Sequence, residues 1–153
     1  MKTIKTLAVV ICAAFALCFT QCTKSPEDLI IGSWSIEDAE LIQTYGNESE
    51  TQHFGPEENE TAVITFNKDN TLTQVETKTE NGITHTSTTY GTYTLEDNKL
   101  SLIWNEDEDE EYETQVYNVE TLNKQDMVLS MSQSGMDEGI LYTVTAKIYL
   151  KRQ

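Results

Sequence analysis

Short runs of alternating apolar and polar residues, separated by turn-forming residues, recur from about residue 31 to the C-terminus. In the clearest run, residues 142–150, every second side chain is apolar and the residues between them are mostly threonine or lysine. Alternation with a period of two is typical of a β-strand with one buried face and one wet face. No stretch of useful length shows the helical period. The pattern therefore predicts an all-β fold.

Turn chemistry marks where these strands end. Asn81-Gly82 is a strong signal for a two-residue hairpin. The segment Asn67–Asn70 joins two further runs, and Asn70 is able to take the left-handed conformation that glycine more often supplies. Residues 96–98 and 123–126 predict two more tight connections. Together these signals predict eight strands, near residues 31–43, 61–67, 71–79, 83–95, 99–104, 112–121, 126–132 and 140–151.

Eight antiparallel strands joined in sequence order close most economically into an up-and-down barrel, because closure removes the exposed edges of an open sheet. A two-sheet β-sandwich is the alternative. We expect three parts in the chain: a signal peptide at 1–21, a tether at 22–28 and the β-domain at 29–153. The 132 residues that follow the signal suffice for one domain with a core of its own.

Four short motifs, at residues 32–34, 64–72, 91–95 and 148–152, resemble runs of a known family. Gly32-Ser33-Trp34 is similar to the G-x-W that opens lipocalin barrels, and the other three look like runs of the lipocalin-like domains of bacterial lipoproteins. The resemblance covers about residues 29–152 and implies an eight-stranded barrel whose closed end is plugged by the tryptophan. It also implies that a basic residue of the last strand, Arg152 or Lys151, packs over that ring.

An eight-stranded barrel either encloses one small ligand or is filled by its own side chains. We carry both hypotheses: a binding protein for a small hydrophobic or amphipathic ligand, and a solid interaction or structural module without a ligand. For the first, the candidate ligand-binding residues of the barrel interior are Trp34, Ile64, Phe66, Tyr93, Leu102, Trp104, Met127, Met131, Tyr142 and Ile148.

The N-terminus has the features of an export signal. Lys2 and Lys5 precede an uncharged apolar run of 13 residues, 7–19, which is the length of a secretory signal core and too short to span a bilayer. The segment Phe19-Thr20-Gln21-Cys22 resembles a bacterial lipobox, in which the cysteine is acylated after cleavage. The alternative is ordinary cleavage after residues 14–16, Ala-Phe-Ala, which would release a soluble protein.

In the lipobox interpretation Cys22 is the lipid attachment residue. All three cysteines lie within the first 22 residues, so the domain itself holds no disulfide. Thr23 stands where the lipoprotein sorting rule would place Asp for retention in the inner membrane. We therefore expect a lipid-anchored protein of the bacterial cell envelope at the outer membrane.

The charge of the chain excludes one class of partner. Without residues 1–21 the chain keeps all 26 acidic residues and loses two of its ten basic ones, so its formal charge is about −18. Nucleic acid binding needs a basic face and is excluded. Anionic lipid headgroups are disfavoured too, so acyl chains on Cys22 have to provide the membrane contact.

The sequence indicates no catalytic set, cofactor or metal site. There is no G-x-S-x-G, and the acidic run at 105–111 is expected to be a solvated loop in preference to a calcium site. His53 and His85 are too isolated in sequence to predict a zinc site. Residues 43–60 are expected to form a long acidic connection at the position of a lipocalin lid. The polar strand at 84–89 is expected at an open rim or beyond it.

Overall fold

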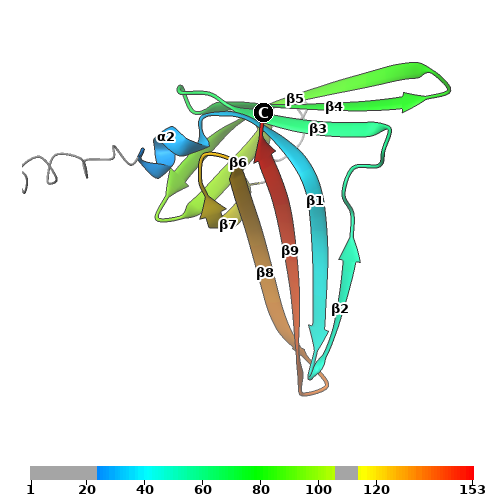
Figure 1. Ribbon diagram of the computed structural model, residues 1–153. Helices are drawn as coiled ribbons and strands as arrows, with labels where there is room; N and C mark the ends of the chain where they lie inside the picture. Colours follow the sequence, from blue (N-terminus) through cyan, green and yellow to red (C-terminus); the bar gives the residue numbers. More distant parts are fainter. Residues whose placement is uncertain (1–23, 106–113) are drawn as a thin grey trace, which may run out of the picture.

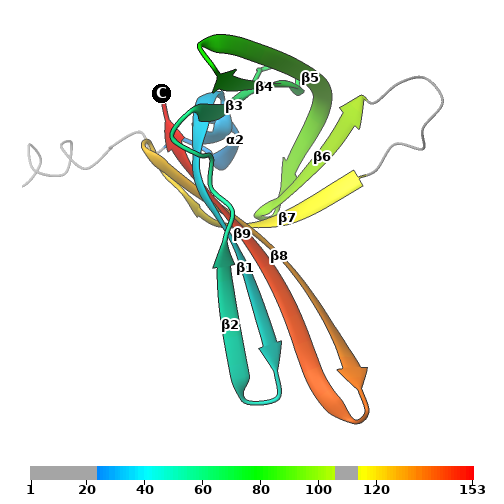
Figure 2. The ribbon, with the colours of Figure 1, turned by 90° about the vertical axis from the view of Figure 1, so that its right-hand side faces the viewer.

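The computed structural model describes residues 24–105 and 114–153 and shows one antiparallel sheet that closes on itself. The strands follow the order β2-β1-β3-β4-β5-β6-β7-β8-β9, and an additional β1–β9 pairing completes the ring (Figures 1 and 2). The elements are α2 (Pro26–Ile30), β1 (Gly32–Tyr45), β2 (Glu48–His53), β3 (Glu60–Phe66), β4 (Thr71–Glu80), β5 (Ile83–Glu96), β6 (Lys99–Asn105), β7 (Thr114–Leu122), β8 (Asp126–Asp137) and β9 (Ile140–Arg152).

The barrel consists of eight strands, as the sequence predicts, and β2 is an additional strand. The pairing of β1 with β9 extends from Trp34–Arg152 to Tyr45–Tyr142. One continuous ladder therefore joins the first and last barrel strands, which rules out the two-sheet sandwich.

The structure corrects the expectation of a long connection at residues 43–60. There β1 continues to Tyr45, turns at Gly46 and returns as β2, which pairs with β1 from Glu40–His53 to Tyr45–Glu48. Every residue of β2 is exposed. The strand therefore lacks the apolar alternation by which the other strands are recognised. β8 likewise extends to Asp137, beyond the predicted end at 132.

The predicted turns are confirmed by their backbone angles. Asn81 and Gly82 both have positive φ, 51° and 78°, as a two-residue hairpin of this type requires. Asn70 has φ of 64°. The turn between β8 and β9 has the same character, with φ of 48° at Glu138 and 84° at Gly139.

Three hairpins extend past the barrel wall, β1–β2, β8–β9 and β4–β5. The distal halves of β1 and β9, flanked by β2 and β8, form a four-stranded sheet that projects from the barrel (Figure 2). Its tip exposes four large apolar side chains, those of Tyr45, Met136, Ile140 and Leu141. The β4–β5 hairpin projects separately (Figure 1), which agrees with the polar character of residues 84–89.

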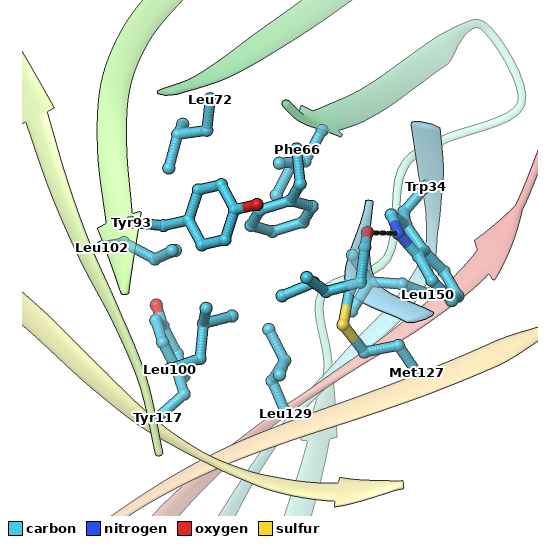
Figure 3. Close-up of a cluster of buried hydrophobic side chains, with 12 residues drawn as sticks. Trp34, Phe66, Leu72, Tyr93, Leu100, Leu102, Tyr117, Met127, Leu129 and Leu150 are labelled. Carbon is cyan, nitrogen blue, oxygen red and sulfur yellow. Dashed lines mark hydrogen bonds between the residues drawn. The ribbon is translucent and has the colours of Figure 1, made fainter. Parts of the chain in front are cut away.

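Side chains of the core fill one end of the barrel (Figure 3). Trp34 is fully buried there, and its indole Nε1 donates a hydrogen bond of 2.7 Å to the Ile30 carbonyl oxygen. Phe66 and Tyr93 meet edge to face, with ring centroids 5.0 Å apart. The buried cluster is made up of Ile30, Trp34, Ile64, Phe66, Leu72, Tyr93, Leu100, Leu102, Tyr117, Met127, Leu129 and Leu150.

The short helix α2 covers this closed end. Ser25 caps it by accepting a hydrogen bond from the Asp28 amide, Pro26 stands in its first turn, and Ile30 is fully buried in the core. Residues 26–28, which the sequence predicts as part of the tether, belong to this helix. Over residues 24–105 and 114–153, no helix has the length and apolar character needed to cross a membrane.

Arg152 fastens α2 to the barrel. Its guanidinium carbon lies 4.3 Å from the centroid of the Trp34 ring. The same group donates hydrogen bonds to the Ile31 carbonyl oxygen, at 2.8 Å, and to the Leu29 carbonyl oxygen. Of the two basic residues considered for this position, Arg152 is therefore the one that packs over the tryptophan.

We predict that Arg152→Met lowers the free energy of unfolding by about 2–4 kcal/mol, because two carbonyl oxygens lose a charged donor at a closed end that water cannot enter freely. Urea denaturation measures the change. Lys151→Met, at the exposed neighbouring position, is the control and should change stability by less than about 0.5 kcal/mol. Equal effects of the two substitutions would contradict this role for Arg152.

Candidate ligand cavity

Beyond the packed end, the barrel interior holds a partly open cavity of about 330 Å³. Its wall is mainly apolar and is contributed by strands from the whole circumference of the barrel. The lining residues are Ile36, Ile64, Gln74, Thr89, Leu102, Trp104, Gln115, Tyr117, Leu129, Ile148 and Leu150. The core side chains therefore fill only part of the barrel.

Polar side chains interrupt this apolar wall at three positions, Gln74, Thr89 and Gln115. The Oε1 atom of Gln115 accepts hydrogen bonds from Trp104 Nε1, at 3.4 Å, and from the Tyr117 hydroxyl, at 3.0 Å. The amide nitrogen remains as the donor that Gln115 can offer to a ligand. We did not select these residues from the sequence, although each continues the inward alternation of its strand, Gln74 after Leu72 and Gln115 before Tyr117.

A second hollow of about 500 Å³ forms the mouth of the barrel. It shares Ile36 and Ile148 with the inner cavity, so the two spaces adjoin. On one side its rim is the segment Phe54–Pro56, which connects β2 to β3. On the other side it is His85–Ser87 of the projecting β4–β5 hairpin. The interior is therefore open at the end opposite Trp34.

Two ion pairs lie at the rim of the mouth. Lys78 Nζ lies 2.8 Å from Glu60 Oε1 and 3.2 Å from Glu80 Oε1. The hydrogen bond from Lys78, aided by a backbone hydrogen bond at Glu57, lowers the pKa of Glu60 below its ordinary value. The hydrogen bonds to Glu60 and Glu80 raise the pKa of Lys78 in turn. These ion pairs are solvent-exposed, so they orient the rim more than they stabilise it.

The ten candidate residues divide between three regions. Ile64, Leu102, Trp104 and Ile148 line the inner cavity. Trp34, Phe66 and Met127 are packed into the closed end with at most 1% of their surface exposed. A molecule in the cavity would therefore meet the first group and not the second.

Tyr93, Met131 and Tyr142 lie outside the cavity wall. Tyr93 is 5% exposed, and its hydroxyl donates a hydrogen bond of 2.8 Å to the Asn67 carbonyl oxygen. Met131 is partly exposed on β8, past the last β7–β8 pair. Tyr142 lies on the projecting sheet, where its ring covers Gly135. Cys22 and most of the acidic run at 105–111 fall outside the described residues.

One group of metal-ligating side chains lies on the outer surface near the mouth. Asp38, Glu40 and His53 bring one ligand atom each to within 4.8 Å of one another. The hydrogen bond that His53 Nδ1 makes to the Asp38 carboxylate raises the pKa of His53 above its ordinary value. The sequence did not suggest this group, because it forms only when β2 pairs with β1.

Comparison with known proteins finds a matching family model and a similar solved structure. The sequence model of the lipocalin-like domain matches residues 30–129. Among solved structures, the chain is similar to a lipocalin-like protein from Bacteroides uniformis ATCC 8492 with 15% sequence identity and a TM-score of 0.49, over 81% of this chain and 98% of that one. No curated protein gives a significant match.

We predict that Lys78→Met raises the pKa of Glu60 towards its ordinary value, since the variant lacks the donor that lowers it. A carboxylate with a lowered pKa stabilises the fold above its unfolded-state pKa, and this stabilisation is lost as the pH falls through the folded-state pKa. The stability difference between wild type and variant should therefore shrink on acidification. Carboxyl titration by NMR measures the pKa, and Lys68→Met is the control. An unchanged Glu60 pKa in Lys78→Met would contradict the assignment.

Proposed function

The chain belongs to the family of lipocalin-like domains, and on that premise we propose that its barrel binds a small apolar or amphipathic molecule. The observation that carries the proposal is the inner cavity of about 330 Å³ that adjoins an open mouth. Ligand sites are usually mainly apolar hollows of about 300–1,000 Å³ with a few placed polar groups. This cavity has that size and that composition.

The lining suggests how such a ligand is oriented. Its apolar part lies between Leu102, Trp104 and Ile148, where burial is worth about 25 cal/mol per Å² of apolar surface. In the wall of the cavity, the amide nitrogen of Gln115 offers a hydrogen-bond donor to the ligand. A polar end of the molecule meets the charged and hydroxyl groups of the rim, among them Glu60, Lys78 and Ser87. An amphipathic ligand thus satisfies both parts of the site.

The competing hypothesis of a solid barrel requires the interior to be filled. Trp34, Phe66 and Met127 do fill the closed end. Trp104 instead lines the cavity, and its ring does not fill it. The cavity therefore favours the binding protein over the solid module. We propose a binding role without catalysis.

We further propose that acyl chains on Cys22 anchor the protein in the bacterial envelope, at the outer membrane. Ser25, the cap of α2, is the third residue after Cys22, so the chain between them spans at most about 10 Å. An anchor at Cys22 would therefore hold the closed end near the lipid. The mouth is lined by His85–Ser87 of the β4–β5 hairpin. That hairpin projects on the side of the barrel away from α2 (Figure 1), so the mouth would face away from that membrane.

We predict saturable binding of the neutral probe N-phenyl-1-naphthylamine, with rising probe fluorescence and quenching of Trp104. Thr89→Phe places a ring in the cavity and should weaken binding at least about tenfold, a loss of about 1.4 kcal/mol. Thr88→Phe is the matched control, because the side chain of residue 88 points to the face of β5 opposite to that of Thr89. Binding that is equal in both variants, or absent from the wild type, would reject the cavity as the site.

We predict that the wild-type protein incorporates a radiolabelled fatty acid during growth and that Cys22→Ala abolishes the label. Cys18→Ala is the control, since Cys18 would leave with the signal peptide, and it should keep the label. An unlabelled wild type, or label that persists in Cys22→Ala, would refute the anchor while leaving the cavity proposal intact.

A further inference from the structure

Three side chains on the outer face of the β1–β2 hairpin converge as metal ligands do. The ligand atoms of Asp38, Glu40 and His53 all lie within 4.8 Å of one another. We propose that these residues form a site for a divalent transition metal of the Zn²⁺ type. The site lies on the surface of the barrel wall and is separate from the ligand cavity.

A β-bulge in β1 creates the convergence. Ile36 pairs with Leu150, but the next pair is Asp38 with Tyr149, so Glu37 is an extra residue. Without the bulge, Asp38 would point to the same side as Ile36, into the barrel. The bulge turns Asp38 outward instead, onto the face of Glu40. Bulges are common where a protein re-aims a functional side chain.

β2 then brings the histidine to the two carboxylates. His53 is the direct partner of Glu40 in the β1–β2 ladder. The strand is held at this point by a hydrogen bond of 2.7 Å from the Phe54 amide to the Ala39 carbonyl oxygen. Gly55 follows so closely over the bulge that a Cβ there would lie 2.9 Å from Asp38 Oδ1. The backbone therefore fixes the spacing of the three ligands.

Hydrogen bonds to the outer oxygens orient both carboxylates. The Ala39 amide donates to Asp38 Oδ1 at 2.9 Å, and the Tyr149 hydroxyl donates to Glu40 Oε2 at 2.9 Å. The other oxygens, Asp38 Oδ2 and Glu40 Oε1, lie 2.9 Å and 4.0 Å from His53 Nδ1. Each carboxylate thus keeps one oxygen for the shared centre. Donors that hydrogen-bond to the ligating carboxylates and fix their orientation are typical of metal sites.

The charges around the centre favour a cation. Lys147 stands opposite Glu40 in the β1–β9 ladder, but its Nζ pairs with Glu120 at 2.8 Å. Within the described residues, the ion pairs of Asp38 and Glu40 are both with His53. With neutral histidine the group carries two negative charges, which match a divalent ion.

The ligand types select among divalent ions. An imidazole nitrogen with two carboxylate oxygens suits Zn²⁺ and its neighbours in the transition series, whereas Ca²⁺ and Mg²⁺ prefer oxygen ligands alone. Three protein ligands leave a fourth position of a tetrahedral ion for water or a partner. An ion here would tie β2 to β1 beside Phe54–Pro56, the segment that forms one side of the mouth.

The test uses untagged full-length protein in detergent micelles, with calcium in excess to occupy sites made of oxygen alone. Co²⁺ is the probe, because its visible absorption reports nitrogen and oxygen ligands, and Zn²⁺ is then added to displace it. We expect one saturable equivalent in the wild type and in His85→Gln, the control at the other histidine. Tyr149→Phe removes only the hydroxyl that orients the Glu40 carboxylate and should weaken binding about 10- to 100-fold.

The variants His53→Gln and Glu40→Gln should lose more affinity than Tyr149→Phe does, with unchanged circular dichroism. Co²⁺ binding in His53→Gln with the affinity and spectrum of the wild type would overturn the proposal, and so would the absence of a saturable equivalent in the wild type. If the substitution at residue 53 unfolded the protein, the Glu40→Gln and Tyr149→Phe pair would decide the question by the same criteria.

Discussion

The closure of one barrel end around Trp34 is the interaction on which the other features depend. The indole donates to the Ile30 carbonyl, and Arg152 stacks on the ring while it binds the carbonyls of Leu29 and Ile31. These contacts join the first strand, the last strand and α2 at a single point. Because that end is sealed, the core can be concentrated there, and a cavity can persist towards the mouth.

The sequence was sufficient to predict the strands that bury one face. In β6 the buried residues Leu100 and Leu102 alternate with more exposed ones, and Asn81-Gly82 has the chemistry of its turn, so both were predicted correctly. β2 was missed because all of its residues are exposed and its pairing with β1 depends on backbone hydrogen bonds, which are independent of side-chain type. Apolar periodicity indicates a buried face, so it does not detect a strand that has no buried face.

The candidate site was harder to predict for a related reason. An inward position looks the same in the sequence whether it is packed or lines a cavity. Phe66 and Trp104 both alternate inward, yet the first is packed at the closed end and the second borders open space. Gln74 and Gln115 were not selected because polar residues suggest a wet face. The metal-ligand group depends on a bulge at Glu37, which the apolar pattern does not record.

Quenching of tryptophan fluorescence by acrylamide tests most directly whether one end is sealed and the other open. The chain has two tryptophans: Trp34 is packed into the closed end, and Trp104 lines the cavity. The wild type should show an accessible and a protected component, and Trp104→Phe, which keeps only Trp34, should show the protected component alone. A saturating apolar probe should protect the accessible component in the wild type. Equal quenching of the wild type and Trp104→Phe would contradict a barrel that is sealed around Trp34 and open at Trp104.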